Sequence, residues 1–126
     1  MPITYSLVQR ANPRDPSAPK KFYAVNQNTG DVDIRELSRI IAEISTVSEI
    51  DTMAVIEAFI KKVPELVADG KIVRLGDFGS FYITLQSDGA DTADAFSNSM
   101  IKKVFLRFRP GKLIKNILKS VTFEKA

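Results

Sequence analysis

The residues best suited to chemistry in this 126-residue chain are cations near its C-terminal end. From Ser99 onward, eight lysines and arginines stand against a single acid, Glu124. Such side chains bind phosphate oxygens, arginine often with two parallel hydrogen bonds. Six of these cations form the candidate interface: Lys102, Lys103, Arg107, Arg109, Lys112 and Lys115.

The spacing of these cations predicts that several of them share a surface. A strand predicted over residues 104–108 would alternate its side chains between two faces. One face would then hold Phe105 with three cations: Lys103, Arg107 and Arg109. The alternative interpretation is an exposed edge strand that its lysines protect from aggregation.

Two further groups of cations are less specific. Lys112 and Lys115 lie near the start of a predicted short helix, whose N–H groups favour phosphate, while Lys119 and Lys125 could serve either binding or solubility. Four N-terminal cations could extend a binding surface, but we favour a role in keeping a loop soluble: Arg10, Arg14, Lys20 and Lys21.

The composition argues against an enzyme. The chain has no histidine and no cysteine, so it lacks the commonest general base and the strongest soft-metal ligands. A metal-dependent hydrolase built on Asp77, Asp88 or Asp91 is the remote alternative, because aspartates in an exposed loop are no preformed oxygen cage. We expect no cofactor, no metal and no small-molecule substrate.

Charge and hydropathy limit the partners. The net charge is +3, yet residues 31–70 hold four cations against nine acids, so that middle segment repels phosphate. No apolar run approaches the ~20 residues of a membrane-spanning helix, and the N-terminus has no signal-peptide pattern. We therefore expect a cytoplasmic protein that does not associate with membranes.

The first half of the chain predicts a hairpin followed by two helices. Residues 3–9 and 21–26 are rich in β-formers and flank a proline-rich loop. One helix should begin at Asp33 and end near Ser45, and a second should run from Ser48 to Gly70 with Pro64 inside it. The second helix is apolar around much of its circumference, which predicts that it packs on two sides, the second against another copy of the chain.

The second half predicts a long β-arm and a short helix. A strand over residues 81–85 follows a glycine turn, and residues 86–100 should be an exposed excursion with little fixed structure. After the returning strand, Pro110-Gly111 should open a short helix with four apolar residues turned inward: Leu113, Ile114, Ile117 and Leu118. Residues 121–123 are a candidate last strand.

Two short motifs in this order resemble the family of HU and integration host factor, and the chain looks like its N-terminally extended branch. They are Gly-Asp-Phe-Gly-Ser-Phe at 76–81 and Phe-Arg-Pro-Gly-Lys at 108–112. The resemblance implies an α+β fold: an intertwined dimer with two helices, a three-stranded antiparallel sheet with a protruding β-arm and a short C-terminal helix. The expected domains are an added β-hairpin over residues 1–30 and an HU-like domain over residues 31–126.

The same resemblance implies an architectural function. It predicts a bacterial, nucleoid-associated homodimer that binds double-stranded DNA largely without sequence preference and uses no catalysis.

In the family an arm proline wedges between base pairs. Here the tip, residues 86–98, has three aspartates and no lysine, arginine or proline, so that Phe96 or Met100 is the candidate wedge and an arm-packing Phe96 is the alternative. The competing function is an HU-fold interaction or structural dimer that has lost DNA bending or binding.

Overall fold

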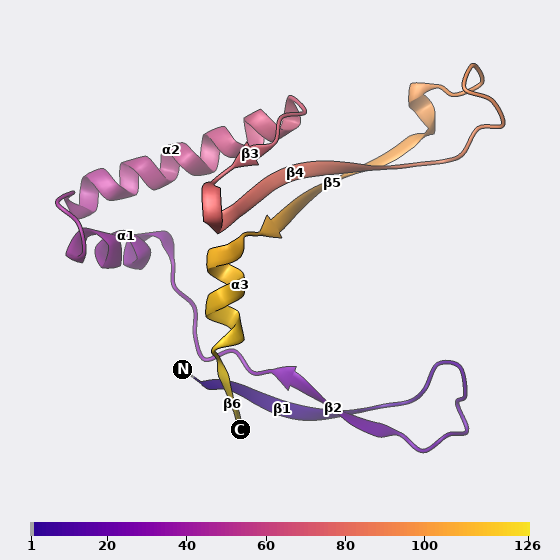
Figure 1. Ribbon diagram of the computed structural model, residues 1–126, viewed down its shortest axis with the longest axis horizontal. Helices are drawn as coiled ribbons and strands as arrows, with labels where there is room; N and C mark the ends of the chain where they lie inside the picture. Colours follow the sequence, from indigo (N-terminus) through magenta and orange to yellow (C-terminus); the bar gives the residue numbers. More distant parts are fainter. Residues whose placement is uncertain (1) are drawn as a thin grey trace. The chain divides into compact units, whose positions relative to one another are not determined.

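A computed structural model of the chain describes residues 2–126 (Figure 1). The described chain divides into two compact units. One contains the residues up to 33 together with 117–126, and the other contains residues 34–116. None of the described helices is long and apolar enough to cross a membrane.

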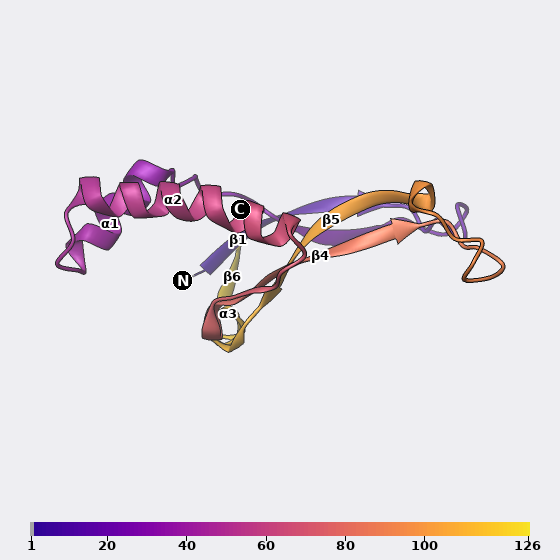
Figure 2. The same cartoon turned by 90° about the horizontal axis from the view of Figure 1, so that it is seen from above.

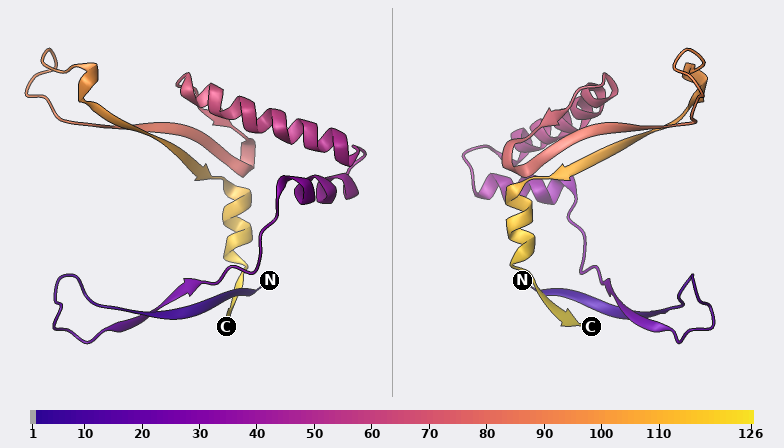
Figure 3. Two further views of the ribbon diagram at one scale, coloured as in Figure 1. Left: turned by 180° about the vertical axis from the view of Figure 1, so that it is seen from behind. Right: turned by 45° about the vertical axis from the view of Figure 1, so that its right-hand side comes forward.

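The N-terminal unit is a three-stranded mixed sheet. β1 (Pro2–Arg10) pairs antiparallel with β2 (Lys21–Asn26), which gives the predicted hairpin. β6 (Thr122–Lys125) then pairs parallel with the other edge of β1, so that the strand order is β2-β1-β6 (Figure 3). The expectation of a lone hairpin is therefore incomplete, because the C-terminal strand completes this sheet.

The second unit begins with two helices close to the predicted positions. α1 (Ile34–Glu43) ends two residues early, because the N–H groups of residues 44 and 45 bond three residues back instead of four. α2 (Glu49–Ala68) begins where Ser48 Oγ accepts the N–H of Asp51 at 3.1 Å, the predicted cap. The helix continues through Pro64, which lacks the N–H that the carbonyl four residues earlier would accept.

An antiparallel sheet of order β3-β4-β5 follows the helices. β3 (Val73–Arg74) is short, whereas β4 (Gly79–Ser87) and β5 (Ile101–Pro110) form a long ribbon (Figure 2). Their register is regular from Gly79–Pro110 to Gln86–Lys103, and then Ser87 faces Ile101. Lys102 is the extra residue of this bulge.

The end of the ribbon is more ordered than expected. The N–H of Asp88 donates to the carbonyl of Met100 at 2.9 Å and closes the excursion, and a 3-10 turn forms at Asn98–Met100. Hydrogen bonds from Ala95 and Phe96 to the carbonyls three residues back add two turns. The excursion is exposed, as predicted, and it contains a few hydrogen-bonded turns that a polar, weakly patterned sequence does not reveal.

The apolar face of the ribbon packs toward α2 but is incompletely covered. Side chains from α2, β4 and β5 line a hollow of about 470 Å³, among them Phe59, Val63, Ile83 and Leu106. In residues 2–126 the only buried hydrophobic residue is Val67, at 5% exposure. The single chain therefore leaves most of its apolar side chains at least partly exposed.

The last helix, α3 (Lys112–Lys119), shows the same exposure. Of its four apolar residues that were predicted to face inward, only Ile114 is half-buried, and Leu113 and Leu118 are more than half exposed. The inward prediction was therefore wrong for the single chain. The helical spacing places these residues on one stripe, and only Ile114 of that stripe is partly covered in the single copy.

Close backbone contact fixes the junction between β5 and α3. Gly111 donates its N–H to the carbonyl of Phe78 at 2.9 Å, and a Cβ at this position would collide with the carbonyl of Asp77. The turn that supplies both carbonyls, Gly76–Phe78, begins with a glycine at φ +58°, a value that disfavours other residues.

We expect Gly111→Ala to destabilise the fold by about 1–3 kcal/mol, the usual cost of overpacking. The matched control is Gly89→Ala, because a Cβ at Gly89 meets no atom within 4 Å and its φ is not in the left-handed region. Urea unfolding followed by circular dichroism measures both free energies of unfolding. Equal stabilities for the two variants would contradict this account of the junction.

Candidate nucleic-acid interface

The β4–β5 ribbon has one cationic face and one apolar face. In an antiparallel pair, directly opposed residues point to the same side. Lys103 faces Gln86, Arg107 faces Tyr82 and Arg109 faces Ser80. Phe81, Ile83, Val104 and Leu106 lie on the other face, toward α2. The predicted grouping of Lys103, Arg107 and Arg109 with Phe105 is therefore what the structure shows.

A further arginine lies in the same row and was missed in the sequence. Arg74 of β3 faces Ser80, and Ser80 faces Arg109, so that all three share one side of the sheet. The missed signal was the short apolar segment before Gly76, in which Arg74 follows Val73 and would point away from it. We call Arg74, Lys103, Arg107 and Arg109 the cationic face.

The ribbon itself orients two of these arginines. Arg107 Nε donates to Thr84 Oγ1 at 3.1 Å, and the guanidinium carbon lies 4.9 Å from the centre of the Phe105 ring. The guanidinium carbon of Arg109 lies 5.3 Å from the centre of the Tyr82 ring. These contacts restrict the side chains before any ligand binds, which lowers the entropic cost of binding.

No carboxylate neutralises the cationic face. Among the described residues, none of its four cations forms an ion pair, and neither does Lys112 or Lys115. Arg39 on α1 provides the contrast: its hydrogen bond to Glu36 and the nearby charge of Glu43 raise its pKa above the usual value. The positive charge of the ribbon therefore stays available to an external anion.

Lys102 is separated from this group. It occupies the bulge, and its Nζ lies 3.3 Å from a carboxylate oxygen of Asp88. The tip beyond it carries Asp91 and Asp94, with Phe96 exposed and Met100 half-buried. Of the six predicted binding residues, Lys102 is thus the one whose charge is already compensated.

Lys112 and Lys115 occupy the first turn of α3, one residue after β5 ends. Both are exposed, and the contact of Gly111 with Phe78 fixes the point where this helix begins. The N–H groups of a first helical turn favour anions, so these lysines add charge to a backbone already suited to phosphate. The six predicted residues therefore divide into three on the ribbon, two on α3 and Lys102 alone.

The phenylalanines around the glycine turn pack against one another. The ring centres of Phe81 and Phe108 lie 4.8 Å apart and those of Phe78 and Phe108 lie 5.4 Å apart, both tilted. Such geometry is typical of stabilising aromatic pairs. These contacts favour a packing role over a platform for stacking bases.

The aspartates considered for a hydrolase are dispersed. Asp77 lies in the Gly76–Phe78 turn and Asp88 pairs with Lys102 at the far end of the ribbon. Among the described residues, no group of three or more carboxylates could hold a metal ion.

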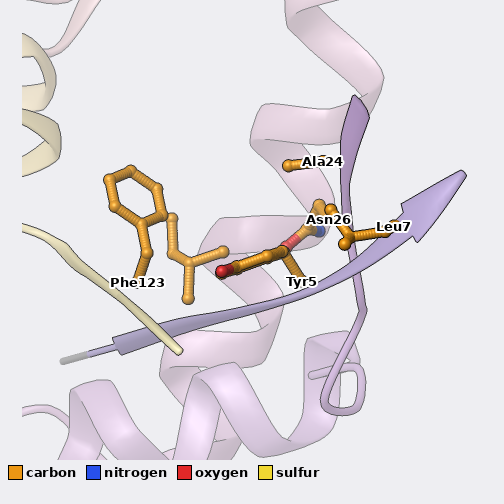
Figure 4. Close-up of a pocket in the computed structure, with 6 residues that line it drawn as sticks. Tyr5, Leu7, Ala24, Asn26 and Phe123 are labelled. Carbon is orange, nitrogen blue, oxygen red and sulfur yellow. The ribbon is translucent and has the colours of Figure 1, made fainter. Parts of the chain in front are cut away.

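The N-terminal sheet carries an apolar hollow of its own, of about 680 Å³ (Figure 4). Its lining comes from β1, β2 and β6: Ile3, Tyr5, Leu7, Ala24, Asn26 and Phe123. The register explains this grouping, because Leu7 faces Ala24, Tyr5 faces Asn26 and Ile3 faces Phe123.

Comparison with known proteins supports the fold. A putative DNA-binding protein from Bacteroides vulgatus matches 98% of this chain with a TM-score of 0.62 and 14% identity, and the chain spans 48% of its length. HU from Anabaena, solved in complex with DNA, matches 71% of this chain and 99% of its own with a TM-score of 0.56 and 22% identity. No curated protein matches the sequence.

A family model covers nearly the whole chain, residues 1–125. It describes an HU domain fused to a winged helix-turn-helix, an immunoglobulin-like domain or a glycine-rich motif. This match confirms the resemblance to HU that the two motifs indicated. The chain belongs to this HU-HIG family.

Proposed function

We propose that this protein binds duplex DNA through the cationic face and the start of α3, as an architectural protein of the bacterial nucleoid. The observation that carries the proposal is the set of four cations on one side of the sheet without a carboxylate partner. The similarity of the fold to HU solved with DNA supports it. No catalytic step is part of this function.

The recognition we propose is largely independent of sequence. Charge contacts to phosphate fix the protein on the duplex but carry no direct sequence information. Each phosphate neutralised releases condensed counterions, so affinity falls as salt rises. Arg107 and Arg109 leave most of their N–H donors for phosphate oxygens.

Reversing a charge on the cationic face should weaken DNA binding. Lys103→Glu and Arg107→Glu, separately and together, should weaken binding to random duplexes, because each places a negative charge opposite phosphate. Lys102→Glu is the control for the change in total charge and should weaken binding less, because Lys102 lies in the bulge beside Asp88 and outside the cationic face. A mobility-shift titration over a series of salt concentrations measures the affinities. Binding that responds neither to salt nor to the reversals would remove the DNA function.

That negative result would favour the second candidate, an HU-fold interaction dimer without DNA binding. The specific observation in its favour is the apolar hollow on the N-terminal sheet, around Tyr5, Leu7 and Phe123 (Figure 4). Exposed apolar surface of this kind is typical of protein contacts. The salt series separates the two functions, because an apolar contact does not weaken as salt rises.

We further propose that the protein acts as a homodimer joined through α2 and the apolar face of the ribbon. Val55 is 66% exposed and Phe59 is 42% exposed on the side of α2 that the single chain leaves uncovered. A second copy would bury these residues and fill the hollow beside Val63 and Leu106.

Light scattering at micromolar concentration should therefore give about twice the chain mass of 14.0 kDa. Val55→Glu should destabilise the fold or produce monomer, because it would place a charge inside the proposed interface. Ala54→Glu is the control, because Ala54 is an exposed neighbour on the same helix and has no large apolar side chain. A stable monomer formed by the unaltered chain would contradict the dimer.

We propose that the protein bends duplex DNA only weakly. The tip carries Asp91 and Asp94 and lacks a proline, so phosphate is repelled where other members of the fold family insert a wedge. Phe96 is 40% exposed and Met100 is half-buried, which leaves both as candidates for an apolar wedge. We favour packing within the arm for Phe96.

Ring closure of short DNA fragments should accordingly be promoted only weakly, and Phe96→Ala and Met100→Ala should change it little. The control is the affinity of each variant for the same fragments in linear form. This affinity should be the same for all variants, so that a change in ring closure reports on bending alone. Strong ring closure that either substitution abolishes would show that the arm does insert a wedge.

A further inference from the structure

The tip of the N-terminal hairpin concentrates positive charge. Arg10, Arg14, Lys20 and Lys21 stand there against one acid, Asp15, which gives residues 10–21 a net charge of +3, equal to that of the whole chain. All five side chains belong to exposed residues. The remainder of the protein is therefore neutral as a whole.

The sheet register places two of these cations directly opposite each other. Arg10 of β1 faces Lys21 of β2, in the last pair before the loop. Like charges opposed in this way destabilise a sheet. Solubility alone does not require this arrangement, because the same charges spaced along the loop would serve it at no such cost.

The single acid of the tip is engaged in the loop itself. Asp15 Oδ1 accepts the hydroxyl of Ser17 at 2.6 Å and the N–H of Ser17 at 3.2 Å. Asn12 accepts the N–H of Arg14 at 3.0 Å through its side chain and that of Asp15 at 3.2 Å through its carbonyl. These bonds order the loop, and no ion pair forms at the tip among the described residues.

The surface at the tip is also hollowed and lies on the less apolar side of the sheet. A depression of about 440 Å³ is lined by Arg10, Lys21 and Tyr23 together with loop residues. Tyr23 shares this face because it pairs with Val8, two positions from the pair of Arg10 and Lys21. The apolar lining around Leu7 and Phe123 lies on the opposite face.

We propose that the hairpin tip is a second binding surface for the phosphate groups of duplex DNA. The ligand is the sugar-phosphate backbone, because several separated cations, none of them in an ion pair, suit a line of anions. Bound phosphate would relieve the repulsion between Arg10 and Lys21. The proposal rests on the DNA-binding function above and adds a contact outside the cationic face.

The test is the salt dependence of DNA affinity in the full-length protein carrying Arg10→Gln and Lys21→Gln together. Loss of two phosphate contacts should reduce the slope of log K against log salt by about 1.8 for each hairpin that binds. The variant should fold at least as stably as the original, because it removes a like-charge pair. Circular dichroism and thermal melting check this point.

Three variants complete the design. Arg35→Gln with Lys61→Gln removes the same total charge from exposed sites on α1 and α2 and should leave the slope unchanged. Arg10→Lys with Lys21→Arg keeps both charges and should keep the salt slope of the original protein. Arg14→Gln with Lys20→Gln leaves the strand pairing intact and should also lower the slope, which keeps the test valid if the first variant unfolds.

The outcomes separate the two proposals. Salt-dependent binding with an unchanged slope in both hairpin variants would overturn the second surface and leave the DNA function standing. An equal loss in the Arg35 and Lys61 control would overturn it as well, because total charge would then explain the effect. No DNA binding by the unaltered protein removes both proposals. Hairpin-dependent binding to phosphatidylserine vesicles, with an unchanged DNA slope, would instead assign the tip to membranes.

Discussion

The antiparallel pairing of β4 with β5, in register from Gly79–Pro110 to Gln86–Lys103, keeps charge and apolar surface on separate faces. If β5 slipped by one residue, Arg107 would turn toward α2 and Leu106 would turn toward solvent. Close contacts hold the register at one end. A side chain at Gly79 would collide with the Phe108 ring and the Arg109 carbonyl, and Gly111 is equally confined beside Asp77.

Regular alternation and helical spacing made much of this arrangement predictable. The cap at Ser48, the two helices, the arm strands and the grouping of Arg107 with Arg109 all follow from local patterns in the sequence. Arg74 was missed because its place on the cationic face depends on which strand lies beside β4, and the only local signal was its alternation with Val73 over two residues. The partner of β6 was missed for the same reason, since parallel pairing with β1 joins opposite ends of the chain.

Lys102 shows a different limit of sequence reasoning. A run of cations suggests that Lys102 and Lys103 act alike, yet one bulge separates them: Lys103 faces Gln86, whereas Lys102 has no cross-strand partner and pairs with Asp88. A bulge arises from the mismatch of two strands, so neither strand alone reveals it. Charge counted along the sequence therefore overstates the charge that the arm presents.

The distribution of charge also explains why a net charge of only +3 is compatible with a polyanionic ligand. On α1 the cation Arg39 pairs with Glu36 and Glu43, and on α2 Lys62 pairs with Glu65, so these two helices each compensate a cation within the element. The cationic face and the hairpin tip do not: among the described residues both lack ion pairs, and Lys102, which pairs with Asp88, lies outside them. Helical neighbours three and four residues apart can pair within one element, whereas a strand must find its counter-charge across the sheet. The cross-strand neighbours of Arg10, Lys21, Lys103, Arg107 and Arg109 are neutral or cationic, so an external anion is the remaining source of compensation for these residues.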